Sequence, residues 1–257
     1  AITNDLKDNA ITNDLKDNAI TNDLKDNTSI KVENIKKADF NLKENNINLE
    51  LQNFSEEPAV FISNHSMAYS PIAFSLYFNK PQRTWIAAPM MDYKTAPKYA
   101  YEDFWGNKKH KLYYKFLGFL SALMLVPLMR GEKGIAVYKD MRIKETFGES
   151  LETLNNGQNI IIFPEKRQKY SKFINELQDG FVDLAHIYYK QSGKYLKFYP
   201  CYTAPTINSI NIGKPIIYNP LEDRRNERQI ITNYLKTEIT KIAESLPEHK
   251  IIPYSYD

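Results

Sequence analysis

His65 is the residue in this sequence best suited to acid–base chemistry near neutral pH, because a free imidazole has a pKa of about 6.5. It lies in the segment FISNHSMAYSP, after an apolar run at Ala59–Ser63 that predicts a buried strand. Ser70 and Pro71 are typical of a helix start, with Ser70 as the N-cap and Pro71 as the first helical residue. We therefore expect His65 in a short strand-to-helix turn, where it can act as a general base. A histidine that only satisfies a loop hydrogen bond is the alternative.

Two further groups of chemically useful residues follow predicted strands. Arg130 follows Met124–Met129, whereas Glu165 and Arg167 follow Asn159–Phe163. A guanidinium donates two parallel hydrogen bonds to a phosphate, so each arginine is a candidate for binding an anion. In a parallel sheet the carboxyl ends of the strands meet at one edge, where ligands bind. Ordinary surface charge is the alternative for either arginine alone, but their joint position favours a function.

The elements expected to position these residues are short apolar strands that alternate with helices. Strands are predicted at Ala59–Ser63, Thr84–Ala88, Met124–Met129, Asn159–Phe163, Leu196–Tyr202 and Lys214–Tyr218. Helices are predicted at Pro71–Phe78, Lys108–Ala122, Ile135–Leu154, Lys172–Tyr189 and Glu222–Ser245. This alternation predicts an α/β fold with a mostly parallel sheet, flanked by helices on both faces.

The composition is that of a globular protein with one main domain, with 42% hydrophobic and 25% charged residues among 257. Residues 1–27 are three copies of AITNDLKDN, so we predict a low-complexity tail at 1–28 and a folded domain at 29–257; a partner-binding arm is the alternative for the tail. The six Asp and three Lys of the repeats give residues 1–27 a net charge of −3. Because the whole chain carries +3, the remainder carries +6. This basic remainder suits an anionic substrate or a membrane surface, or is a basic face in water. The single cysteine, Cys201, excludes multi-thiolate metal sites and favours an intracellular protein, and no strong nucleic-acid-binding signature is present.

Taken in order, these segments resemble the motifs of the glycerolipid (lysophospholipid) acyltransferases, the family that includes 1-acylglycerol-3-phosphate acyltransferases. The family's first motif is Asn-His, four further residues and Asp, which here reads from Asn64 to Ser70. Its second motif, a strand that ends in Arg, resembles VPLMR, and its third, Phe-Pro-Glu-Gly-Thr-Arg, resembles Phe163–Arg167. A later strand with a proline resembles FYPCY, at Pro200. The four blocks follow the family's order and cover about Ala59–Pro205.

The resemblance implies transfer of a fatty acyl group from the thioester of acyl-CoA or acyl-carrier protein to a hydroxyl of a lysophospholipid or related glycerolipid. His65 would be the catalytic base. Arg130 and the turn that contains Glu165 would hold the phosphate of the acceptor or order the site around it. The motifs make the following the predicted substrate-binding residues: Asn64, Arg130, Pro164, Lys166 and Arg167. No metal or redox cofactor is implied.

Two departures from the family pattern affect the expected site. The family has an aspartate at the position of Ser70, where its carboxylate orients the histidine, and Ser70 brings no negative charge. Neutralising the analogous aspartate of serine proteases lowers turnover about 10⁴-fold. An active enzyme would therefore need another carboxylate beside the histidine, and Glu165 is the candidate for that role. Arg167 stands two residues after Glu165, where the family has three, so the acceptor is expected to differ or the site to have decayed. The alternative function is therefore a catalytically weak or inactive relative that binds lipid or acyl-CoA.

The segment Asn107–Leu120 joins lysines to aromatic and aliphatic residues, which predicts a helix that lies in a membrane interface. A helix packed in the core is the alternative. The apolar run Phe116–Met129 is shorter than the roughly 18–20 residues that span a bilayer, so no transmembrane helix is predicted. Asp92–Trp105 is expected to form a lid over an acyl groove, or a loop. With no secretory signal visible, we expect a cytoplasmic protein that is peripheral at the inner face of the membrane.

Overall fold

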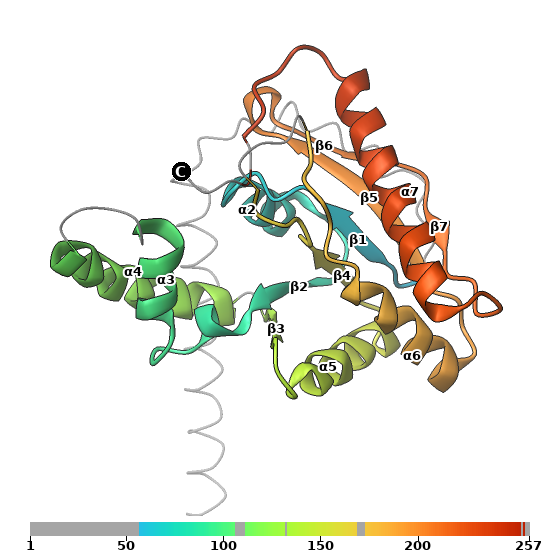
Figure 1. The fold of residues 1–257 in the computed structure, drawn as a ribbon, viewed down its shortest axis with the longest axis horizontal. Coiled ribbons are helices and arrows are strands. Elements are labelled where there is room, and N and C mark those ends of the chain that lie inside the picture. The colour runs from blue at the N-terminus through green and yellow to red at the C-terminus, as the bar shows by residue number, and fades with distance from the viewer. Residues whose placement is uncertain (1–56, 106–110, 132, 169–172, 253, 255–257) are drawn as a thin grey trace, which may run out of the picture. The chain divides into compact units, whose positions relative to one another are not determined.

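The computed structural model describes residues 57–105, 111–131, 133–168, 173–252 and 254, so the predicted tail at 1–28 lies outside the described residues. Their centre is a seven-stranded sheet surrounded by helices (Figure 1). The strands are β1 (Val60–Ser63), β2 (Gln82–Ala87), β3 (Ile135–Val137), β4 (Asn159–Ile162), β5 (Lys197–Ala204), β6 (Ser209–Ile212) and β7 (Ile216–Ile217). The α-helices are α2 (Tyr69–Tyr77), α3 (Ala96–Trp105), α4 (Lys111–Gly131), α5 (Ile143–Asn155), α6 (Asp183–Ser192) and α7 (Arg224–Ser245). Three short 3-10 helices are η2 (Ala88–Met91), η3 (Gly180–Val182) and η4 (Pro205–Ile207).

The strands lie in the order β3-β2-β4-β1-β5-β6, and β7 also pairs with β5. The first five in this order are parallel, whereas β6 and β7 are antiparallel to β5. The prediction of a mostly parallel sheet is therefore confirmed. β1 lies between β4 and β5, with Ile62 level with both Ile162 and Pro200. The carboxyl end of β1 consequently lies between two strands that carry predicted motifs.

Different helices cover the two faces of the sheet, because side chains alternate along each strand. Ile62 belongs to a core cluster that includes Leu154 of α5 and Leu235 of α7. The neighbouring Phe61 belongs to a second cluster, in which it lies with Phe74 of α2. The predicted flanking of the sheet by helices on both faces is confirmed.

Helix α4 is the largest departure from the predicted elements. Met124–Met129 was expected to be a strand, but it lies within this helix, with Pro127 inside its last turns. A proline removes one backbone donor from a helix and is disfavoured in its interior. Gly118, Ala122 and Val126 are buried at a spacing of four residues, and the last two form an apolar cluster with Ala96 of α3. This helical stripe of small residues, packed on α3, accounts for the helix.

Other expected elements have different bounds or types. The predicted helix Ile135–Leu154 divides into β3 and α5, because Ile135 pairs with Trp85 of β2 and the helix begins only at Ile143. Helix α6 begins at Asp183, well after the expected start at Lys172, which itself lies outside the described residues. Asp92–Trp105, expected to be a lid or a loop, contains α3. Strand β6 was not predicted.

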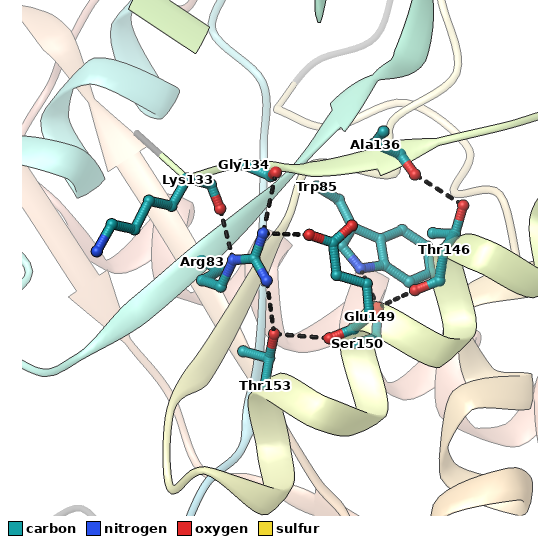
Figure 2. A network of polar contacts seen from close by, with 9 residues as sticks. All are labelled: Arg83, Trp85, Lys133, Gly134, Ala136, Thr146, Glu149, Ser150 and Thr153. Atoms are coloured by element: carbon teal, nitrogen blue, oxygen red, sulfur yellow. Dashed lines mark hydrogen bonds and ion pairs between the residues drawn. The ribbon is translucent and has the colours of Figure 1, made fainter. Parts of the chain in front are cut away.

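Arg83 joins β2 to the loop before β3 and to α5 (Figure 2). Its Nε donates to the carbonyl of Lys133 at 2.5 Å, and its Nη2 donates to the carbonyl of Gly134 at 3.2 Å. The guanidinium also forms an ion pair with Glu149 and donates to Thr153 Oγ1 at 3.4 Å. These contacts tie the chain that leaves α4 to the sheet.

Gly118→Ala is expected to destabilise the protein by about 1–3 kcal/mol, the usual cost of overpacking. The new Cβ would lie 2.7 Å from the carbonyl oxygen of Pro97 and 3.2 Å from Cβ of Tyr101, so α3 and α4 would have to separate. Gly148→Ala is the matched control, because its Cβ on α5 would meet no atom within 4 Å. This control should gain up to about 1 kcal/mol from helix propensity. Urea unfolding measures both changes, and equal midpoints for the two variants would contradict the close packing of α3 on α4.

Candidate active site

Asn64 fixes the turn that follows β1 to the end of β5. Its Oδ1 accepts from the backbone N of Thr203 at 2.8 Å and from Thr203 Oγ1 at 3.1 Å. Its Nδ2 donates to the carbonyl of Thr203 at 3.1 Å and to Ser66 Oγ at 2.7 Å. Because both protons of the amide are used within the protein, the geometry favours a positioning role for Asn64 over the predicted binding of substrate.

The imidazole of His65 is oriented by a backbone carbonyl. Its Nδ1 lies 2.5 Å from the carbonyl oxygen of Met67. The turn brings this carbonyl back toward the ring, because Ser66 and Met67 have φ of 38° and 55°, a region that few residues other than glycine adopt. Since a carbonyl oxygen only accepts, Nδ1 carries the proton of the neutral ring and Nε2 holds the lone pair.

Glu165 contacts the main chain of His65. Its Oε2 accepts from the backbone N of His65 at 2.9 Å, and its Oε1 accepts from the backbone N of Asn175 at 2.8 Å. Burial raises the pKa of the Glu165 carboxyl, and these two backbone bonds oppose that shift. The carboxylate was expected to substitute for the missing aspartate, but its described bonds position the histidine backbone and do not reach the ring.

Arg167 supplies positive charge to the same place. Burial lowers the pKa of the His65 imidazole from 6.5 to about 4; the bond to the Met67 carbonyl opposes this shift, and the charge of Arg167 adds to it. The Arg167 guanidinium lies over the ring of Tyr254, 4.7 Å from its centroid. His65 is therefore neutral at pH 7, which is the form that a general base requires.

Two other residues of the third block lie in the same turn. Pro164 is buried, and its carbonyl accepts from the backbone N of Gln178 at 2.8 Å. Lys166 is exposed, and its backbone N donates to the carbonyl of Glu176 at 2.8 Å. These bonds pair the turn with a neighbouring segment, and the binding of substrate by either residue stays a prediction.

Ser70 does not cap helix α2. The N-cap is Ala68, which makes no side-chain capping bond, and Ser70 is the second residue of the helix. The hydroxyl of Ser70 is fully buried and shares a hydrogen bond with the hydroxyl of Thr203. Ser70 thus helps to join α2 to β5, while the ring of His65 takes its orientation from Met67.

Arg130 does not follow a strand, which corrects the expected second block. It lies in the last turn of α4, where its Nε donates to the carbonyl of Met91 at 2.9 Å and its guanidinium lies 5.4 Å from the centroid of the Tyr93 ring. Met91 ends η2, which directly follows β2. Within the described residues no hydrogen bond, ion pair or ring contact joins Arg130 to His65, so His65, Glu165 and Arg167 are the residues that the structure brings together.

Several residues of this site carried no signal in the sequence. Met67 contributes only a backbone atom, and Thr203 lies 139 positions from its partner Asn64. Asn175 and Tyr254 contact the site from segments that contain none of the recognised motifs. Among the described residues, no group of three or more His, Cys, Asp or Glu is placed to hold a metal ion.

Comparisons with known proteins add a limited structural likeness. No protein-family model matches the sequence, and no curated protein matches it. Among solved structures, the 1-acyl-sn-glycerophosphate (LPA) acyltransferase PlsC from Thermotoga maritima aligns with 86% of this chain and 81% of that chain, at a TM-score of 0.48 and 12% sequence identity. This likeness is one of backbone fold.

Glu165→Gln is expected to lower the free energy of unfolding by about 1–3 kcal/mol, the cost of a buried hydrogen-bonding group left without a partner. A glutamine side chain has one acceptor oxygen, so it can serve the backbone N of His65 or that of Asn175, and its NH₂ group would face the other. Glu176→Gln is the control, because Glu176 is exposed and forms a surface ion pair with Lys236. Its loss should change the unfolding free energy by less than about 1 kcal/mol. Urea unfolding at pH 7 compares the two variants, and equal losses would contradict the bridging role of Glu165.

Proposed function

We propose that this protein is an acyltransferase that moves a fatty acyl group from a thioester to a hydroxyl of a lysophospholipid or related glycerolipid, with His65 as the general base. The observation that supports this proposal most directly is the bond from His65 Nδ1 to the Met67 carbonyl. That bond leaves the lone pair of the neutral ring on Nε2. Ordered sequence blocks around His65 and Glu165 support the same reaction.

In the proposed reaction, Nε2 of His65 takes the proton of the acceptor hydroxyl as its oxygen attacks the thioester carbonyl. A tetrahedral intermediate forms and then collapses to the ester. The C–S bond breaks, and the departing thiolate takes the proton back from the imidazolium. The donor is acyl-CoA or acyl-carrier protein, and no external oxidant or reductant is needed.

The anionic group of the acceptor has a specific role in this scheme. The charge of Arg167 and the burial of His65 both disfavour the imidazolium, whereas the Met67 carbonyl stabilises it only as a neutral dipole. A phosphate bound at Arg167 would offset that charge and raise the basicity of His65. The proposed substrate is therefore an acceptor with a phosphate near its free hydroxyl.

His65→Ala is expected to lower acyl transfer by about 10²- to 10⁴-fold, the usual contribution of a general base. The assay combines purified protein with long-chain acyl-CoA or acylated carrier protein and a panel of lyso-lipids that includes lysophosphatidic acid. His186→Ala is the matched control, because this histidine lies on α6 and its described bond is to the hydroxyl of Tyr218. Product from the wild type and the control, but not from His65→Ala, is the expected result.

Equal amounts of acylated product from the wild type and His65→Ala over the whole panel, with both donors, would contradict the enzymatic proposal. Tight binding of lyso-lipid or acyl-CoA without turnover would instead favour the alternative of a binding protein without catalytic activity.

Helix α4 supports a membrane-bound acceptor, because one of its faces is apolar and exposed. The large side chains on that face are Leu112, Tyr113, Phe116, Phe119, Leu120, Leu123 and Met124. They recur at helical spacing on the side opposite Gly118, Ala122 and Val126, which are buried. The helix has no acidic residue and carries exposed basic residues near both ends, Lys111, Lys115 and Arg130. We propose that this face lies in an anionic membrane surface.

The length of α4 also corrects an expectation from the sequence. The run Phe116–Met129 was expected to be too short to span a bilayer. The whole helix has 21 residues, and by length and composition alone it could cross a membrane. Packing on the charged helix α3, where Lys98 lies 3.8 Å from Glu102, favours a position along the surface over one across the bilayer.

The double variant Phe116→Glu/Met124→Glu is expected to lose at least about tenfold in binding to vesicles, because two carboxylates would enter the apolar layer and repel anionic headgroups. The control is Met141→Glu/Leu221→Glu, which adds the same charge at two side chains that are also exposed, by 80% and 94%. Co-sedimentation with vesicles of phosphatidylglycerol and phosphatidylcholine measures binding. Equal losses for both double variants would show that net charge, not the face of α4, governs attachment.

A further inference from the structure

Tyr254, near the end of the chain, lies flat on the imidazole of His65. The ring centroids are 4.2 Å apart and the ring planes differ by 5°. Phe163, the residue after β4, also contacts the imidazole, with centroids 5.6 Å apart and planes tilted by 59°. Two aromatic rings from distant parts of the sequence therefore restrict the ring of His65.

The third sequence block and the segment that follows it hold Tyr254 in place. Asn175 Nδ2 donates to the carbonyl oxygen of Tyr254 at 2.9 Å, and the backbone N of Gln168 donates to the same oxygen at 3.4 Å. The guanidinium of Arg167 lies over the ring of Tyr254, 4.7 Å from its centroid. The backbone and the ring of Tyr254 are thus held separately, by hydrogen bonds and by a cation–π contact.

We propose that Tyr254 is a positioning residue for His65, which fixes the plane of the imidazole and shields one of its faces from water while Nε2 receives the proton. This role rests on the proposed acyl transfer. The aspartate that orients the histidine in the resembling family is Ser70 here, and Ser70 is bonded to Thr203. The Met67 carbonyl and the Tyr254 ring together restrict the imidazole in place of that carboxylate.

The charged groups around the ring set the sign of the expected pH effect. The positive charge of Arg167, in the turn after β4, disfavours protonation of the imidazole. Glu165 reaches the backbone N of His65, and the Met67 carbonyl reaches Nδ1. Burial is the largest cause of the lowered pKa of His65, so removal of the Tyr254 ring should admit water and let that pKa rise.

The first test is a titration of the His65 ring by NMR, assigned from the resonance that is lost in His65→Ala. The wild type is expected to titrate at a pKa of about 4, and Tyr254→Phe at the same value, because phenylalanine keeps the stacked ring. Tyr254→Ala should move the pKa toward 6.5. Tyr195→Ala is the matched control, since Tyr195 is an exposed tyrosine whose ring contact is with Tyr189. An unchanged His65 pKa in Tyr254→Ala would contradict the stack.

The second test is kinetic and uses the full chain with vesicle-borne lyso-lipid. Tyr254→Ala is expected to lower kcat by on the order of ten- to hundredfold with little change in KM, as for a misplaced catalytic group, and Tyr254→Phe should restore kcat. The acid limb of the kcat profile should move to higher pH in Tyr254→Ala, because a larger fraction of His65 is then protonated at a given pH. An increase in kcat would overturn the proposal, since it would show that Tyr254 obstructs the site.

A third variant tests the same contact without altering either ring. Asn175→Ala removes the side-chain bond to the Tyr254 carbonyl and leaves the backbone bond from Asn175 to Glu165. It should shift the His65 pKa in the same direction as Tyr254→Ala, but by less. Failure of the wild type on every acceptor would overturn the proposed function and the kinetic role of Tyr254 with it, whereas the titration would still decide whether the ring covers His65.

Discussion

The position of His65 depends on the contact between Asn64 and Thr203. Parallel strands β1 and β5 would pair without it, but pairing alone does not determine the path of the chain after Ser63. The amide of Asn64 joins that path to β5 through Thr203 and also donates to Ser66 within the turn. Asn64 is only 3% exposed, so these bonds form where water cannot compete with them. Ser70 joins α2 to the same threonine. One buried polar network thus fixes the strand before the histidine and the helix after it.

Glu165 extends this network to the other side of β1. Its two oxygens accept backbone protons from His65 and Asn175, which makes a buried carboxylate tolerable because both bonds stabilise the charged form. The carboxylate therefore accepts from backbone N–H groups. The imidazole itself contacts a carbonyl and two aromatic rings, and the charge of Arg167 acts on it. Such surroundings favour a neutral histidine, so in the proposed reaction the substrate would have to supply the charge that stabilises the imidazolium. A phosphate is well suited to that task.

Local pattern was enough to predict β1, β4 and β5 and the helices α2, α5 and α7 in outline, because short apolar runs and helical spacing mark them clearly. It failed where tertiary contacts override local preference. Strand β3 has three residues and exists through pairing with β2, and α4 keeps Pro127 because Ala122 and Val126 pack on α3. Within the site, His65, Glu165 and Arg167 could be predicted from their place after strands. Contacts such as Tyr254 on His65 could not, since nothing in the sequence relates positions that distant.

The Arg83 network connects the site to the proposed membrane surface. Arg83 on β2 holds the carbonyls of Lys133 and Gly134, just after α4 ends, and Arg130 holds the carbonyl of Met91, where η2 ends. The segment that contains α3 and α4 is therefore tied to β2 by Arg83 and to η2 by Arg130. Strand β2 in turn pairs with β4, the strand that leads into Glu165. An apolar helix attached to lipid in this way would hold the carboxyl edge of the sheet at a fixed height above the bilayer. A lyso-lipid is anchored by its single acyl chain and presents its hydroxyl and phosphate at the headgroup level, so a fixed height is what the proposed reaction at His65 would require.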